Sequence, residues 1–283
     1  MKLEDVLRQR MPEASRRTLK QLLEHGRVTV DGAVVRRLDL SIRDKAEVEV
    51  RARTAGEAPA RPLPQGVRIV FEDDAVLVVE KPAGLLTIAT DTEKRRTLYA
   101  ALRDHVKAAS AADKIFIVHR LDRDTSGLLV FAKTNAAKET LQAAFAARHV
   151  DRTYTAVVEG VVAESEATLT SFLVESSALK VHVTRDRNRG VEAITKYRVV
   201  RRGRHHTLVE IDLVTGRKAQ IRVQFADAGH AVAGDRVYGA GSGMVARLML
   251  HASRLAFDHP VTRRRMAFRS RPPSDFAALV RET

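Results

Sequence analysis

The most informative stretch of this sequence is His119-Arg120-Leu121-Asp122-Arg123-Asp124-Thr125-Ser126-Gly127. Two apolar segments that are typical of strands, residues 114–118 and 128–132, flank it. Polar residues in a loop between rigid strands are the usual location of catalytic groups. Within this loop Asp122 lies between two arginines, which favour an ionised carboxylate that can act as nucleophile or general base. The residues alone fit a surface loop of ion pairs, closed by a turn, equally well.

Asp122 and Asp124 together raise the question of a metal site. Carboxylates are the preferred ligands of hard cations such as Mg²⁺ and Ca²⁺. Here, however, their neighbours are arginines, and no further carboxylates cluster nearby in the sequence. We therefore expect no metal ion, and a metal-dependent nuclease is the weakest functional alternative.

The segments around this loop show strand patterns mixed with a few helical ones. Strands are predicted at residues 67–71, 76–79, 152–159, 193–201, 207–213 and 248–257. Helices are predicted at residues 135–149, 218–228 and 274–281. Such a mixture predicts an α+β fold with a mixed, largely antiparallel sheet flanked by helices.

The first fifty residues are typical of a separate small α/β unit. A helix is predicted from Ser15, which can cap it, to residue 25, and Gly26 suits its end. Leucines spaced at i, i+3 and i+4 give the helix one apolar face. Its basic residues lie elsewhere on the surface, and they are Arg16, Arg17 and Lys20. Short strands are predicted to follow at residues 28–30, 34–35 and 46–50.

Residues 51–65 differ in composition from both of their flanks. Three of the eight prolines of the chain fall here, among small residues with no hydrophobic period. This composition predicts a flexible, partly extended linker. We therefore expect a small domain at residues 1–50, a linker at 51–65 and a larger domain at 66–283.

The overall composition limits the class of partner. The 283 residues include 49 Lys and Arg against 35 Asp and Glu, which gives a net charge of +14. Such an excess favours a polyanionic partner, because clustered cations attract phosphates and release their counterions. The chain has no cysteine. That excludes disulfide scaffolds, thiolate zinc sites and cysteine nucleophiles.

The sequence has no feature of a membrane protein. Its first residues lack the apolar core and the small-residue cleavage site of a signal peptide. No apolar run approaches the ~20 residues that a membrane-spanning helix needs. We therefore expect a soluble, cytoplasmic protein without a membrane partner.

As a string, the loop at residues 119–127 closely resembles the catalytic motif of the RluA-type RNA pseudouridine synthases. Other segments resemble this family in the expected order, and they are Glu72-Asp73-Asp74, Lys81-Pro82-Ala83-Gly84-Leu85, Arg152-Thr153-Tyr154-Thr155-Ala156, Thr215-Gly216-Arg217-Lys218-Ala219-Gln220-Ile221-Arg222, Gly229-His230, Gly234-Asp235, Tyr238-Gly239 and Leu250-His251-Ala252. The resemblance covers residues 67–260. Residues 1–50 resemble the alpha-L type of small RNA-binding domain, which often precedes these enzymes.

The resemblance implies an isomerase, an intramolecular transferase that converts uridine in RNA to pseudouridine. The N1–C1′ bond breaks, the base turns, and C5 joins C1′. Asp122 would be the essential carboxylate, either by attack on C1′ or by proton abstraction at C2′, and the sequence leaves both routes open. Because no oxidation state changes and no group is transferred to another molecule, the reaction needs neither a cofactor nor a metal.

The resemblance also implies roles for three further residues. Tyr154 would pack on the flipped uracil and assist proton removal from C5, whereas without the resemblance a strand tyrosine is as often ordinary core. Arg222 would pair with the catalytic carboxylate, although an arginine on a helix is usually a solvated charge. Arg120 would fill the gap left by the flipped base, because its planar guanidinium can stack there.

The remaining predicted substrate-binding residues are His119, Arg123, Thr125, Arg217 and Ile221. We expect His119 to be mainly structural. In the N-terminal domain, Arg16, Arg17 and Lys20 would bind RNA. Base extrusion is least costly in loops, so structured RNA is the expected substrate, with ribosomal RNA ahead of transfer RNA. We expect a stand-alone monomer.

Two positions depart from the family pattern. Lys218-Ala219 stands where the family has Thr-His, which removes a hydrogen-bonding group near the site and puts substrate choice or local geometry in question. Arg152 replaces the usual lysine with another cation. The first departure gives some weight to a different function, a non-catalytic RNA-binding or ribosome-assembly protein. Because Asp122, Tyr154 and Arg222 are all present, we expect an active enzyme.

Overall fold

The computed structural model describes residues 2–11, 16–24, 26–43, 46–50, 62–109, 113–239 and 245–281. Its contacts divide the chain into a small N-terminal unit and a larger unit, and each is described by itself. The predicted cap Ser15 and residues 51–61 of the predicted linker lie outside the described residues. The domain boundaries at 50 and 66 stay a prediction.

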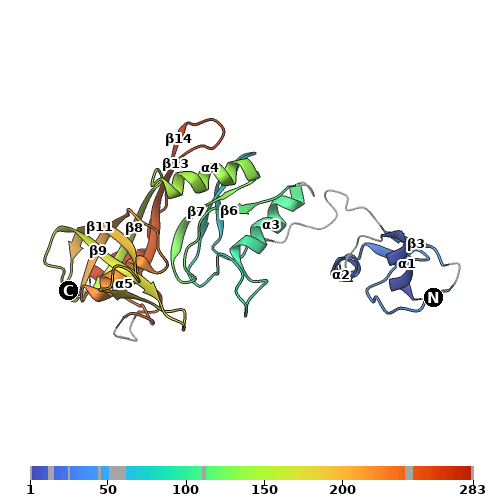
Figure 1. Ribbon diagram of the computed structural model, residues 1–283, viewed down its shortest axis with the longest axis horizontal. Coiled ribbons are helices and arrows are strands. Elements are labelled where there is room, and N and C mark those ends of the chain that lie inside the picture. The colour runs from blue at the N-terminus through green and yellow to red at the C-terminus, as the bar shows by residue number, and fades with distance from the viewer. Residues whose placement is uncertain are drawn as a thin grey trace. The chain divides into compact units, whose positions relative to one another are not determined.

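The small unit packs two helices against a three-stranded antiparallel sheet of order β2-β1-β3 (Figure 1). Its elements are α1 (Leu3–Arg10), α2 (Arg16–Glu24), β1 (Val28–Val30), β2 (Ala33–Val34) and β3 (Val48–Val50). The predicted leucine face of α2 is buried against Leu3 and Leu7 of α1, a helix that the sequence patterns did not predict. Asp31 and Gly32 both have positive φ, which gives the tight turn between β1 and β2.

The larger unit is built on one sheet in which nine strands run in the order β10-β9-β11-β12-β8-β13-β7-β5-β4, while β14 pairs with β13 and β6 with β7. The strands are β4 (Arg68–Glu72), β5 (Val76–Lys81), β6 (Phe116–Ile117), β7 (Ser126–Ala132), β8 (Asp151–Glu159), β9 (Glu166–Glu175), β10 (Val181–Thr184), β11 (Val191–Arg202), β12 (His206–Leu213), β13 (Leu250–Asp258) and β14 (Arg265–Arg269). Among the described pairs of this sheet, only β7 and β13 run parallel. The predicted α+β fold with a largely antiparallel sheet is confirmed.

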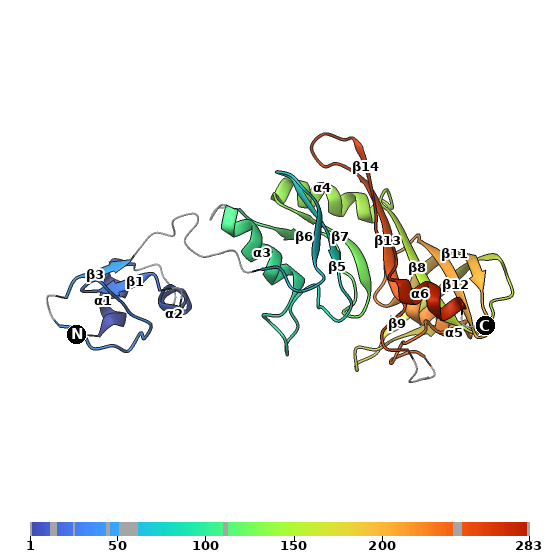
Figure 2. The same cartoon turned by 180° about the vertical axis from the view of Figure 1, so that it is seen from behind.

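Four helices cover the two faces of this sheet, as Figures 1 and 2 show. They are α3 (Leu98–Ala109), α4 (Asn135–Ala146), α5 (Gln220–Asp227) and α6 (Ser274–Arg281). Strand β7 explains the division, because its alternate side chains enter different cores. Leu129 and Phe131 pack in the core that contains residues of α3, α5 and α6, while Leu128 and Val130 pack in the one that contains residues of α4. A strand covered on both faces reads as a continuous apolar run.

Two predicted helices differ from the observed ones at the ends that border the site. The helix predicted at 218–228 begins only at Gln220, because Ala219 has a left-handed backbone with φ +51°. The helix predicted at 135–149 ends at Ala146, and Arg148 shortly beyond it is also left-handed, with φ +62°. Helix α3 and strands β9, β10 and β14 were not predicted. No helix in the described part of the chain is long and apolar enough to cross a membrane.

Candidate active site

The loop between β6 and β7 is fixed by hydrogen bonds from a distant segment. The buried Thr87 hydroxyl donates to the Leu121 carbonyl at 2.7 Å and accepts from the Leu121 amide at 3.3 Å. The buried Lys81 ammonium donates to three carbonyls, those of Pro82, Leu85 and Arg123, at 2.8–3.0 Å. Burial lowers the pKa of Lys81 to about 7, although the Asp124 and Asp122 carboxylates oppose this shift. Both contacts tie the backbone around Asp122 to the segment after β5.

The other end of the loop is joined to β13. Ser126 Oγ lies 2.8 Å from His251 Nδ1 and accepts a hydrogen bond from Arg247 at 2.6 Å. His251 Nε2 lies 2.9 Å from Ser270 Oγ, and burial lowers the pKa of His251 to about 4. Next to Ser126, Gly127 has φ +111°, and a Cβ there would lie 2.3 Å from the Ala252 carbonyl oxygen. Only glycine fits this close approach between β7 and β13.

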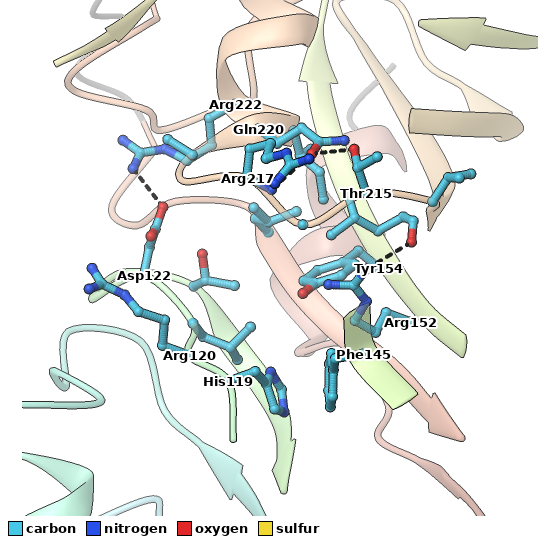
Figure 3. A pocket seen from close by; sticks show the side chains of 18 of the residues that line it. His119, Arg120, Asp122, Phe145, Arg152, Tyr154, Thr215, Arg217, Gln220 and Arg222 are labelled. Carbon is cyan, nitrogen blue, oxygen red and sulfur yellow. Dashed lines mark hydrogen bonds and ion pairs between the residues drawn. The ribbon is translucent and has the colours of Figure 1, made fainter. Parts of the chain in front are cut away.

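Asp122 is paired with Arg222 of α5, one hundred positions away in the sequence (Figure 3). Arg222 Nη1 donates to Asp122 at 3.2 Å, while Nε and Nη2 donate to the two oxygens of Asp235 at 2.7 Å. Burial lowers the pKa of Arg222, but the Asp235 and Asp122 carboxylates outweigh it and hold the pKa above its usual value. The predicted pair is thus present, and a second carboxylate fixes the guanidinium.

Asp235 holds the Arg222 guanidinium of this pair in place. Its side chain is fully buried, and it accepts hydrogen bonds from the amides of Val237 and Tyr238 at 2.9 and 3.1 Å. Burial raises the pKa of Asp235, but the Arg222 guanidinium and these amides more than offset that, so its pKa is lowered. Bidentate pairing also fixes the plane of the guanidinium. The guanidinium of Arg222 lies 5.1 Å from the centre of the Tyr238 ring.

The Asp122 carboxylate faces a pocket of about 470 Å³ that lies between the loop, β8 and the start of α5 (Figure 3). Tyr154 lines it from β8, and only 7% of that residue is exposed. Burial raises the pKa of the Tyr154 phenol, and the Asp122 charge adds to this against the opposing effect of Arg152. The phenol is therefore neutral at physiological pH. The pocket thus places the Asp122 carboxylate, the Arg222 guanidinium that pairs with it and the neutral Tyr154 ring together.

In one wall of the pocket a neutral histidine and an arginine both lie against the ring of a phenylalanine. The His119 ring lies 4.6 Å from the Phe145 ring, and its Nε2 accepts from the Val130 amide at 3.2 Å. Burial, with the Arg152 charge, lowers the pKa of His119 to about 3, so this imidazole is uncharged at neutral pH. Arg152 lies 5.4 Å from the centre of the Phe145 ring and donates to the Leu213 carbonyl at 3.3 Å.

The predicted substrate-binding residues divide into those that line the pocket and one that does not. Arg120, His119, Thr125, Arg217 and Ile221 line it. Arg123 does not, and its Nε donates instead to the Gly84 carbonyl at 3.3 Å. Arg120 is exposed and has no hydrogen bond or ion pair among the described residues.

The segment before α5 is organised by Gln220, to which we assigned no role from the sequence. Its Oε1 accepts from the Thr215 hydroxyl and from the Arg217 amide, at 2.8 and 3.0 Å. Its Nε2 donates to the Ile194 carbonyl and the Thr195 hydroxyl of β11. This buried carboxamide fixes the backbone that presents Arg217 to the pocket. Asp235, Lys81 and Gln220 were given no role from the sequence, because the contacts that bury and orient them form only in the folded chain.

Of the unusual pair Lys218-Ala219, one residue lines the pocket and the other does not. Ala219 lines it, whereas the Lys218 ammonium pairs with the Glu175 carboxylate and donates to the Leu179 carbonyl at 2.8 Å. Lys218 therefore connects the start of α5 to the turn between β9 and β10. It occupies none of the space facing Asp122.

The basic residues predicted to bind RNA in the small unit lie on α2. Arg16 and Lys20 are exposed, and Arg16 pairs with Glu4 of α1 at 3.2 Å. The side chain of Arg17 lies outside the described part of the structure. The described residues contain no group of three or more His, Asp or Glu side chains that could hold a metal ion.

Comparison with known families places two models on the chain. The model described as RNA pseudouridylate synthase matches residues 75–227, and the S4 domain model matches residues 1–48. The first range contains the loop, Tyr154 and Arg222, and ends at the last residue of α5.

Individual proteins match over nearly the whole chain. A protein of Pseudomonas aeruginosa called ribosomal large subunit pseudouridine synthase D is 37% identical, over 99% of this chain and 91% of its own length. A protein of the same name from Neisseria meningitidis is 35% identical, over 99% of this chain and 78% of its own length. Among solved structures, human RNA pseudouridylate synthase domain containing 4 has a similar fold, with a TM-score of 0.63 at 23% identity, over 77% of this chain and 92% of that one.

Proposed function

The chain belongs to the RNA pseudouridylate synthase family, RluA type with an N-terminal S4 domain, whose enzymes isomerise uridine to pseudouridine. We propose that the substrate of this chain is ribosomal RNA and that Asp122 is its essential carboxylate. The observation that carries the assignment of Asp122 is its pairing with Arg222 at 3.2 Å beside the pocket. A guanidinium that is itself fixed orients the carboxylate with which it pairs.

The reaction needs one carboxylate that remains close to the ribose. In one route Asp122 attacks C1′ as the N1–C1′ bond breaks, and in the other it removes a proton from C2′. In both routes the uracil then turns and C5 bonds to C1′, while the bond from Asp122 to C1′ breaks in the first route and the proton returns to C2′ in the second. C5 loses its proton and N1 takes one up, so the product is an isomer of uridine. Arg222 acts here as the partner that holds the carboxylate, and each of its three side-chain nitrogens donates to Asp235 or Asp122.

Tyr154 is proposed to pack on the flipped uracil and to assist proton removal from C5. Its raised pKa supports the packing role in particular, because a neutral phenol is a poor base and a good aromatic surface. Arg120 is proposed to occupy the space of the extruded uridine, since its guanidinium is exposed and uncommitted. Thr125, Arg217, Ile221 and His119 line the pocket that would receive the base.

The domain boundaries and the role of the N-terminal unit belong to the same proposal. Residues 1–50 would form the RNA-binding domain through Arg16, Arg17 and Lys20, residues 51–65 the linker, and residues 66–283 the catalytic domain. The S4 match at residues 1–48 supports this assignment. The choice of ribosomal over transfer RNA rests on the names of the relatives. We propose that the enzyme acts as a monomer in the cytoplasm.

The direct test is a comparison of pseudouridine maps in cells with and without this chain. We expect one or a few uridines of the large ribosomal RNA to remain unmodified in the deletion strain and to be modified again when the wild-type chain is restored. Loss of sites in transfer RNA alone would contradict the proposed substrate. Identical maps would favour the non-catalytic alternative of RNA binding or ribosome assembly.

A further inference from the structure

Arg148 lies directly beyond the end of α4 in a backbone conformation that favours glycine. Its φ is +62°, its amide donates to the Phe145 carbonyl at 3.2 Å, and the next amide, of His149, donates to the Ala144 carbonyl at 2.9 Å. These bonds close the helix end in the manner that usually places glycine at the left-handed position. An L side chain is strained in this conformation, which raises the question of what the side chain does.

Arg148 is one of the residues that line the pocket that contains Asp122. Five non-glycine residues in the described part of the chain have positive φ, and two of them, Arg148 and Ala219, line this pocket. Ala219 ends in a methyl group, whereas Arg148 brings a full positive charge. The strained position and the pocket therefore coincide at a residue that can bind an anion.

The other arginines of the pocket differ from Arg148 in their partners. Arg152 and Arg217 donate to backbone carbonyls, and Arg222 is held by two carboxylates. Arg148 is exposed, and its side chain makes no hydrogen bond or ion pair with the described residues, a property that it shares only with the Arg120 side chain among the pocket arginines. Its five N–H donors are thus available to a ligand.

The charge of the pocket indicates the chemistry of that ligand. Five arginines line it against a single carboxylate, Asp122, and His119 is neutral. A uracil base is uncharged and does not offset this excess, whereas the phosphates on either side of a nucleotide do. A planar guanidinium binds a phosphate through paired hydrogen bonds.

We propose that Arg148 is a substrate-binding residue that contacts a backbone phosphate next to the flipped uridine. The proposal rests on the RNA-modifying function above, and it adds a residue that anchors the RNA strand at the mouth of the pocket. Arg120 and Arg148 then have separate tasks, because one replaces the extruded base and the other holds the adjoining phosphate. The strain at Arg148 is accepted because a glycine, although better suited to the backbone, could not bind the RNA.

The test uses Arg148→Gly, which removes the guanidinium and relieves the backbone. The matched control is Arg263→Gly, since Arg263 is also an exposed arginine with positive φ, +59°, but lies in the turn between β13 and β14 and does not line the pocket. Wild type and both variants are titrated against whichever RNA the wild type modifies, transcribed large ribosomal RNA or bulk transfer RNA, at several salt concentrations. Melting temperatures are measured in parallel.

We expect Arg148→Gly to weaken RNA binding about five- to tenfold near 100 mM salt and to lower the slope of log Kd against log salt by about 0.7–0.9, the effect of one lost phosphate contact. Its melting temperature should equal or exceed that of the wild type. Arg148→Lys should keep most of the salt slope, and Arg263→Gly should bind within twofold of the wild type.

An Arg148→Gly variant whose Kd and salt slope change no more than those of Arg263→Gly would overturn the proposal. A fall in the melting temperature would also contradict it, since the side chain would then serve the fold. A wrong assignment of ribosomal RNA as the substrate would give a different result. The wild type would then modify transfer RNA and leave ribosomal RNA unmodified.

Discussion

Arg222 and Asp235 show how this fold holds a charge at the edge of a pocket. The two nitrogens of Arg222 that face Asp235 are occupied at 2.7 Å, which leaves Nη1 for Asp122. Because Asp235 is fully buried and also accepts two amides, the guanidinium cannot turn without losing several hydrogen bonds. Asp122, a quarter of whose side chain is exposed, keeps access to substrate while its partner is rigid.

Lys81 provides a test at the scale of a single residue, through the dependence of stability on pH. Its pKa is lowered by burial from 10.5 to about 7, so between these values the unfolded chain binds more protons than the folded one. Stability therefore rises with pH in this window. Relative to Lys81→Met, the wild type should gain up to about 1.4 kcal/mol of unfolding free energy per pH unit between about pH 7 and 10.

Urea unfolding of both proteins at pH 6.5, 8 and 9.5 measures this difference. Below about pH 7 the free energies of unfolding of the wild type and Lys81→Met should change with pH in parallel, because Lys81 is then protonated in both the folded and the unfolded chain. Parallel curves up to pH 10 would show that the ammonium stays charged among its three carbonyls, contrary to the lowered pKa.

At the scale of the elements, the junction of β7 and β13 determines where the loop ends. The two strands run parallel with Ser126 opposite His251 and Gly127 opposite Ala252. The site therefore depends on a pairing between segments more than a hundred residues apart. We expect this junction to tolerate no side chain at position 127.

Gly127→Ala should lower the free energy of unfolding by about 3 kcal/mol, because the added Cβ would lie 2.3 Å from the Ala252 carbonyl oxygen in addition to straining φ. Gly229→Ala is the control, since Gly229 also has positive φ, +83°, but nothing lies within 4 Å of its added Cβ. Gly229→Ala should lower the free energy of unfolding by only about 1 kcal/mol. Equal costs in urea unfolding would refute the importance of the close approach.

The sequence patterns predicted those elements that have a clear period or clear ends. The hairpin of β4 and β5 and strands β8, β11 and β12 were predicted within one or two residues, because apolar runs end there at polar turns. The start of α5 was misplaced, since nothing in an alanine at position 219 indicates a left-handed backbone. Strands β9 and β10 were missed because polar and short segments form strands only when the sheet extends to them.

The same limit applies to the site. Asp122, Tyr154 and Arg222 were identified because they lie in strings that resemble a family, and the structure brings all three to one pocket or its edge. Asp235 and Gln220 were quoted in those strings without a role, because their partners are set by tertiary packing. Arg148 was missed altogether, since neither its backbone conformation nor its exposure to the pocket has a sequence pattern.

The net charge of +14 belongs to a molecule with an N-terminal unit and a catalytic unit, both of which are proposed to bind RNA. Removal of residues 1–50 should weaken RNA affinity and flatten its salt dependence, because the contacts of that unit with phosphates are lost. The larger unit has its own cores and should still unfold cooperatively. Unchanged affinity in filter-binding titrations would assign the N-terminal unit another purpose.

Asp122 is proposed to perform the isomerisation, and release of tritium from RNA labelled at uridine C5 measures that reaction. Asp122→Asn should bind RNA and melt like the wild type but release no tritium, because the amide can neither attack C1′ nor take a proton from C2′. Asp124→Asn, an exposed carboxylate of the same loop that does not line the pocket, is the matched control and should stay active. Tritium release by Asp122→Asn within tenfold of the wild-type rate would show that another group performs the reaction.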